Sequence, residues 1–204
     1  MKLLLTTLGV ASLWIAVASP LAHLDHHLLT AHMVQHLLLM LVAAPLVLLG
    51  MGLQRPAVLH PAFCWVAGTL TVIVWHVPVV FELALQSPFL HVIEHASFFF
   101  AGILFWWPVI SPGIEARWSV PLYLFFATLP CDALSAFLTF CGHVVYPHYL
   151  SCIRNVRLSP LDDQALAGAL MWVTVTFAYL VPALIVTARL LANERTRVAE
   201  LGSV

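Results

Sequence analysis

The sequence predicts an all-α fold, a polytopic transmembrane helical bundle with about six spanning helices. Of its 204 residues, 62% are hydrophobic and only 8% are charged, whereas an ordinary soluble domain carries roughly 25% charged residues. Several apolar runs reach the length of a spanning helix, about 17–25 residues, and the ~10-residue alternating segments of a spanning barrel do not occur in the sequence. These apolar runs predict that the protein lies in a lipid bilayer. The net charge of -1 gives no reason to expect nucleic acid as a partner.

Six apolar runs are expected to form the spans of one transmembrane domain that covers residues 1–204. Turn-forming Pro, Gly and Ser residues separate the runs, and the short connections predict antiparallel neighbours. The last helix has a clear start, because Ser159 can cap it and Pro160 suits its first position. Asp162 and Asp163 favour the positive end of that helix. The runs lie at about 3–19, 31–49, 62–80, 91–110, 119–140 and 165–190.

The basic residues predict that the N-terminus and the C-terminus are both cytoplasmic. This orientation leaves more basic residues inside than outside, as the positive-inside rule requires. The loops at 20–30, 81–90 and 141–163 then face outward, toward a periplasm or its equivalent. The inner basic residues are Lys2, Arg55, Arg117, Arg189, Arg195 and Arg197, and the outer ones are Arg154 and Arg157.

The first apolar run has a second interpretation, as a cleaved signal peptide. Lys2, the apolar stretch 3–17 and the small residues Ala16-Val17-Ala18 resemble a signal sequence with its cleavage site. Both interpretations place residues 20–30 on the outer side, so the predicted sidedness does not depend on the choice between them.

Ten of the eleven histidines are predicted to lie at the outer face of the membrane. Only His60 falls on the inner side. Imidazoles are common transition-metal ligands, so this one-sided clustering predicts a metal or haem site. The ten are His23, His26, His27, His32, His36, His76, His91, His95, His143 and His148.

Four of these histidines form two pairs with helical spacing, His32 with His36 and His91 with His95. Residues four apart on a helix share a face and lie about 6 Å from each other, so each pair can aim at one ion. Met40 continues the first pair one turn deeper, and a His-His-Met column suits copper. The alternative for Met40 is packing or lipid contact.

His76 adds a third element, near the outer end of the third run, and its alternative is an interfacial histidine bonded to a carbonyl. His91-Val92-Ile93-Glu94-His95 also fits the H-x-x-E-H pattern of inverted zinc proteases. Glu94 lies ~100° around the helix from His95, so we expect it to hydrogen-bond a ligand histidine instead.

Several other polar residues are candidates for accessory roles. Asp132 lies inside a predicted span, where it can serve as a proton or ligand-orienting group or pair with another helix. Cys141 and Cys152 can form a disulfide or bind copper, and their spacing does not decide between these uses. The accessory candidates at the mouth of the site are His23, Asp25, His26 and His27.

The stretch Ala31-His32-Met33-Val34-Gln35-His36-Leu37-Leu38-Leu39-Met40, running on to Ala44-Pro45-Leu46 and Gly50, resembles the CtaG-type assembly factors of caa-type cytochrome oxidases. The resemblance covers roughly residues 23–190 and includes both histidine pairs. Further matches are Trp75-His76-Val77-Pro78, His91 to His95 with Glu94, Phe105-Trp106-Trp107-Pro108, and Asp163-Gln164 with Gly168, Met171 and Trp172.

This resemblance implies a multi-pass protein of the bacterial inner (cell) membrane that matures cytochrome c oxidase by delivering copper, as a metallochaperone and not an enzyme. The implied partners are oxidase subunits or other copper chaperones, and a homo-oligomer is compatible with it. The chain has six apparent spans where longer relatives have about seven. The residues implied for the metal are His32, His36, His76, His91 and His95, with Glu94 as support.

Three other functions remain open at the level of sequence. A membrane copper redox enzyme would use the same ligands with an open coordination position. A haem protein could use two histidines on facing helices, such as His36 and His95. A zinc-dependent membrane hydrolase would need Glu94 beside an activated water.

Overall fold

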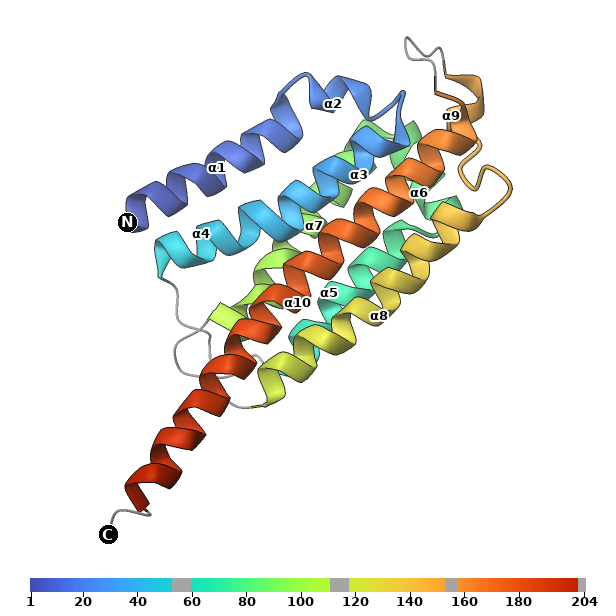
Figure 1. Cartoon of the computed structure of the whole chain (residues 1–204). Helices are drawn as coiled ribbons and strands as arrows, with labels where there is room; N and C mark the ends of the chain where they lie inside the picture. The colour runs from blue at the N-terminus through green and yellow to red at the C-terminus, as the bar shows by residue number, and fades with distance from the viewer. Residues whose placement is uncertain (53–59, 111–117, 153–157, 202–204) are drawn as a thin grey trace.

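The computed structural model describes residues 1–52, 60–110, 118–152 and 158–201, and every regular element within these ranges is helical (Figure 1). Five of the helices are long and apolar enough to cross a membrane, or six if one bent pair is counted as a span. The prediction of an all-α protein is therefore confirmed, and the expected number of about six spanning helices compares with five or six candidate spans. The elements are α1 (Lys2–Ala18), α2 (Leu21–Leu24), α3 (Leu29–Leu37), η1 (Leu38–Ala43), α4 (Ala44–Met51), α5 (Pro61–Trp75), α6 (Pro78–Gln86), α7 (Pro88–Ile110), α8 (Ser119–Phe140), α9 (His148–Ser151) and α10 (Pro160–Leu201).

The two ends of the bundle differ in composition. Figure 1 shows α2, α6 and α9 at one end, together with the first turns of α3 and α7, and both termini toward the other end. The ten clustered histidines lie in α2, α3, α7 and α9 or in the segments that join elements at this end, whereas His60 precedes α5 at the opposite end. Four of the basic residues used to predict orientation, Arg55, Arg117, Arg154 and Arg157, lie outside the described residues.

The third predicted span is broken. α5 ends at Trp75, and α6 leaves its axis at an angle of 74°. Pro78 begins α6 without a backbone N–H to continue the helix, and Val77 before it is extended, with φ -64° and ψ 124°. This corrects both the continuous span expected over 62–80 and the loop expected over 81–90, most of which is α6.

The second span, Leu29–Met51, is one continuous helix whose middle part, η1, is π-helical. η1 begins at Leu38, two residues after His36, the last histidine of α3, and such π segments are frequent at functional sites. The Trp106 indole on α7 donates to the Met40 carbonyl at 3.0 Å. A Cβ at Gly102 would lie 2.9 Å from that same carbonyl oxygen, so only glycine permits this approach. The contact fixes how α7 is placed along the second span, and hence how the two histidine pairs meet.

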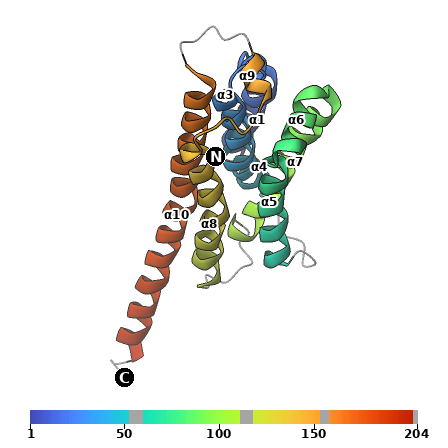
Figure 2. The same ribbon diagram turned by 90° about the vertical axis from the view of Figure 1, so that its right-hand side faces the viewer.

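The N-terminus of α3 is capped by a different helix. Asp163, in the first turn of α10, accepts hydrogen bonds from the backbone N–H groups of Leu29 at 2.8 Å and Thr30 at 3.1 Å. Figure 2 shows α3 and α4 running between α10 on one side and α5 with α7 on the other. The start of α10 is capped as predicted, because Ser159 Oγ accepts from the Asp162 N–H at 3.1 Å. Asp163 therefore holds α3 in place, a role that its position in the sequence did not indicate.

Candidate metal centre

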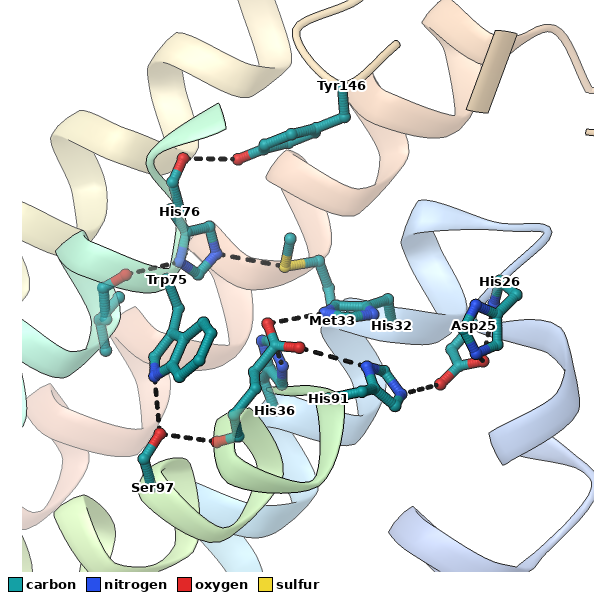
Figure 3. Close-up of polar contacts among 12 residues, drawn as sticks. Asp25, His26, His32, Met33, His36, Trp75, His76, His91, Ser97 and Tyr146 are labelled. Atoms are coloured by element: carbon teal, nitrogen blue, oxygen red, sulfur yellow. Dashed lines mark hydrogen bonds and ion pairs between the residues drawn. The ribbon is translucent and has the colours of Figure 1, made fainter. Parts of the chain in front are cut away.

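A buried carboxylate, that of Glu94 on α7, lies at the middle of the histidine cluster. Its side chain has no exposed surface. Oε1 lies 3.2 Å from His32 Nε2 and 3.4 Å from His36 Nε2, and Oε2 lies 3.3 Å from His91 Nδ1 (Figure 3). One negative charge therefore faces three imidazoles from two helices.

The two predicted histidine pairs converge on this carboxylate. Within the pairs, the ring centroids of His32 and His36 are 4.4 Å apart, and those of His91 and His95 are 4.3 Å apart. Between the helices, the distance from His95 is 6.0 Å to the His32 ring and 5.7 Å to the His36 ring. We refer to these four histidines and Glu94 as the Glu94 centre.

A second carboxylate extends the centre outward through His91. Asp25, between α2 and α3, is fully buried, and its Oδ2 lies 2.9 Å from His91 Nε2. A carboxylate accepts hydrogen bonds, so Nε2–H of His91 donates here. The Nδ1 atom faces Glu94 Oε2, and either a proton or a metal ion at Nδ1 would place positive charge beside that carboxylate. The donor set therefore has room for a metal ion in place of a proton.

The residues at the outer edge of the centre are held in the protonation states that favour metal binding. Burial raises the pKa of Asp25, but its hydrogen bond to His91 and the neighbouring imidazoles outweigh this and hold the pKa below its usual value. Burial lowers the pKa of His26, and although Asp25 raises it, the net pKa lies below the usual value. Near neutral pH an ionised Asp25 and a neutral His26 are the ligand forms that a metal requires.

Several imidazole nitrogens of the Glu94 centre make no hydrogen bond to the described residues. They are buried, and each unpaired polar atom of this kind costs about 1–3 kcal/mol. A neutral imidazole has one lone-pair nitrogen, through which each ring could coordinate a metal. The unpaired atoms are His32 Nδ1, His36 Nδ1 and Nε2, His91 Nδ1 and His95 Nε2.

Among the described residues, two groups have donor atoms within 4.8 Å of one another and could hold a metal ion. One consists of His32, His91 and Glu94, and the other of Asp25, His26 and His91. His91 belongs to both groups, so they form neighbouring parts of one centre.

His76, the fifth predicted ligand, lies beside the Glu94 centre and has its own partner. Its Nδ1 donates to the Val72 carbonyl at 2.7 Å, and its Nε2 lies 3.3 Å from Met33 Sδ (Figure 3). Its ring centroid is 6.2 Å from that of His36. The sequence reasoning missed Met33, although it stands three residues before His36 and so shares its helical face. Met40, which was predicted, lines the same small cavity as His36 and His76.

The remaining accessory candidates are His23, His26, His27 and Asp132, and they differ in their surroundings. His23 and His27 are exposed, whereas the His26 ring lies 5.1 Å from that of His91. Asp132 on α8 accepts a hydrogen bond from Thr176 Oγ1 on α10 at 3.3 Å, which corresponds to the predicted alternative of pairing with another helix.

The segment between α8 and α10 covers the centre. Tyr146 donates its hydroxyl to the His76 carbonyl at 3.1 Å, and Tyr149 donates to the Asp25 carbonyl at 2.8 Å. Both tyrosines are almost completely buried. Their hydroxyls therefore fix the backbone at two of the residues that surround the site.

Cys141 and Cys152 lie in this covering segment and are not joined by a disulfide. The Cys141 thiol lies 3.5 Å from His143 Nδ1. The Cys152 thiol instead donates to the His26 carbonyl at 3.1 Å. Cys152 therefore helps to hold the loop that carries Asp25 and His26.

A comparison with known families identifies the family of this chain. The model of the cytochrome c oxidase caa3 assembly factor family matches residues 2–193, which include every residue of the Glu94 centre as well as His76 and Met33. No match was found among curated proteins or among solved structures. Because the match extends over nearly the whole chain, this protein belongs to the family of cytochrome c oxidase caa3 assembly factors.

Proposed function

We propose that the protein binds copper at the Glu94 centre and delivers it to cytochrome c oxidase during assembly of the oxidase. The observation that carries this proposal is the buried Glu94 carboxylate in contact with three imidazoles. Family membership supplies the oxidase as the client. The proposal makes the protein a metallochaperone and not an enzyme.

The chemistry of the donors favours copper over the hard cations. Magnesium and calcium require mainly oxygen ligands, whereas imidazole suits copper, zinc, iron and nickel. Among divalent ions a site of this kind binds Cu²⁺ most tightly. The carboxylates of Glu94 and Asp25 supply negative charge that offsets part of the cost of burying a cation.

The position of the centre suits transfer of an ion. A cavity of about 600 Å³ between α1 and α7 is lined by Asp25, His26, His91 and His95. His26, His91 and His95 form a series of donors that leads inward. Their ring centroids are 5.1 Å apart from His26 to His91 and 4.3 Å apart from His91 to His95. We propose that copper moves along this series by exchange of one ligand at a time.

We also propose the topology that this function requires. The chain would be a single transmembrane domain in the bacterial inner membrane, with both termini cytoplasmic and the Glu94 centre facing the periplasm. The described basic residues Lys2, Arg189 and Arg195 support this, since Lys2 begins α1 and the two arginines lie in the last part of α10. Oxidase subunits or other copper chaperones would then meet the protein at its periplasmic end, and a homo-oligomer is compatible with this arrangement.

Two of the alternatives fit the geometry less well. The His36 ring stacks on Phe98 with centroids 3.7 Å apart, and the cavity that His36 lines has a volume of about 30 Å³. Ligand pockets usually measure about 300–1,000 Å³, so the space beside His36 is too small for a porphyrin. His95 lines the cavity of about 600 Å³ instead, and His36 does not, so the predicted haem pair does not face one cavity. A hydrolase would need Glu94 as a general base beside a metal-bound water, but both Glu94 oxygens face imidazoles.

The substitution Glu94→Gln tests the proposal. It preserves the size of the side chain and removes the charge that faces three imidazoles, so the affinity of the purified protein for Cu²⁺ is expected to fall about 10- to 100-fold. The affinity would be measured by competition with a chelator. Oxidase from cells that carry this variant is expected to contain less copper than oxidase from wild-type cells.

Glu82→Gln is the matched control. Glu82 lies at the same end of the bundle, and its Oε1 accepts from the His148 N–H at 3.0 Å, a bond that glutamine can retain. This variant should bind copper like the wild type and support a fully loaded oxidase. Equal Cu²⁺ affinity in Glu94→Gln and Glu82→Gln would contradict the proposal.

A further inference from the structure

We propose that Met33 and His76 belong to a second metal site, separate from the Glu94 centre and selective for Cu(I). The site rests on the proposed copper function and extends it by assigning a monovalent ion to a different set of donors. It lies where α3 passes the junction of α5 and α6.

The distance between the two donors fits joint coordination of one ion. His76 Nε2 and Met33 Sδ are 3.3 Å apart, and both side chains are at least 95% buried. Metal bonds of about 2.0 Å to nitrogen and about 2.3 Å to sulfur place two donors about 3.3–3.5 Å apart at a bond angle of roughly 100–110°. The two atoms can therefore hold one ion with little rearrangement.

The protonation of His76 leaves the correct nitrogen available. The Val72 carbonyl can only accept, so Nδ1 carries the proton in their 2.7 Å hydrogen bond. In a neutral ring Nε2 is then a lone-pair donor, and its neighbour Met33 Sδ has no proton to give it. Metal-binding histidines are commonly oriented in this way, by donating their other N–H to a carbonyl.

The surroundings of the pair favour a soft ion of low charge. Met33 and His76 line a cavity of about 30 Å³, which is enough space for one water molecule or one metal ion. No carboxylate lies among its lining residues, so a divalent ion would lack compensating charge there. Thioether and thiolate sulfur suit Cu(I), zinc and iron–sulfur clusters, and Cu(I) is the one of these that carries a single positive charge. The donors that line the cavity are Met33, Met40, Met171, His36, His76 and Cys131.

His36 connects this cavity to the Glu94 centre. It lines the cavity, while its Nε2 lies 3.4 Å from Glu94 Oε1. Neither of its ring nitrogens makes a hydrogen bond to the described residues, although its side chain is 96% buried. The two sites therefore adjoin through a histidine whose ring nitrogens have no partner among the described residues, and Glu94 is not among the residues that line the Met33 cavity.

Met33→Leu tests the second site, with Met51→Leu as its matched control. Leucine fills a similar volume, so the fold should persist, and Met51 is an exposed methionine at the end of α4. The full-length protein, purified in detergent without metal, would be titrated with Cu(I) against a competing chelator. X-ray absorption at the copper edge would report whether sulfur is a ligand.

Wild type, Met51→Leu and Glu94→Gln are expected to bind one Cu(I) with a sulfur ligand. Met33→Leu should lose the sulfur signal and bind Cu(I) about tenfold or more weakly, while its Cu²⁺ affinity is unchanged. Copper without sulfur in the wild type, or an unchanged sulfur signal in Met33→Leu, would overturn the second site. The proposed function would fail separately, through a Cu²⁺ affinity that does not respond to Glu94→Gln.

Discussion

Replacing His36 and His95 together with alanine is expected to abolish stoichiometric copper in the purified protein. Both side chains are more than 90% buried, both carry ring nitrogens without hydrogen bonds to the described residues, and their rings are 5.7 Å apart across α3 and α7. His36 also lines the Met33 cavity, so its loss affects both proposed sites. Copper per chain would be measured by elemental analysis.

The control for this variant replaces His23 and His27, which are exposed on the segment around α2. Their loss is expected to leave copper content unchanged and to slow loading. A milder double variant, His36→Gln with His95→Gln, keeps most of the buried volume and guards against misfolding as the cause of copper loss. Wild-type copper content in either His36/His95 double variant would refute the assignment of these residues as ligands.

Asp163→Ala is expected to cause the largest loss of stability among substitutions outside the metal centre. Asp163 is fully buried and accepts from the backbone N–H groups of Leu29 and Thr30 and from the Thr30 hydroxyl. Alanine leaves two backbone donors unpaired, at about 1–3 kcal/mol each. For a chain of this size the Tm should fall by roughly 10 °C, measured by thermal unfolding in detergent.

The neighbouring aspartate provides the comparison. Asp162 is exposed, and its hydrogen bonds to the described residues are with Ser159 at the start of α10. Asp162→Ala should therefore cost about 1 kcal/mol or less. Because α3 carries His32 and His36, Asp163→Ala should also weaken copper binding, whereas Asp162→Ala should not. Equal Tm values for the two variants would show that Asp163 does not anchor α3.

The helical pairs of the site could be predicted because they depend on local geometry. A spacing of four residues places His32 with His36, and His91 with His95, on single helical faces. The second and fourth spans both begin at the end that carries the histidines and pack side by side, which brings the two faces together. Glu94 is turned ~100° from His95 and was expected to hydrogen-bond a ligand histidine, which agrees with its 3.2 Å contact to His32. Its spacing of three from His91 gives the better signal, since such residues are neighbours on a helix.

Other features depend on contacts that no local pattern records. Asp163 caps a helix that begins 134 residues earlier in the chain. The π-helical segment after His36 arises among residues with no distinctive spacing. The break at Pro78 did have a local signal, because proline cannot continue a helix. The apolar run continues through this position, however, and therefore predicted one unbroken span. This break ends α5 at Trp75, directly before His76. The separation of His76 from the Glu94 centre follows from it.

Elemental analysis of the detergent-purified wild-type protein, combined with its optical spectrum, tests the central claim most directly. The Glu94 centre predicts copper at a stoichiometric level and no Soret band. A copper redox enzyme would share this composition but would turn over quinol or oxygen, which an assembly factor does not. A Soret band, zinc in place of copper, or protein that binds no copper when it is supplied would contradict the assignment of this centre to copper.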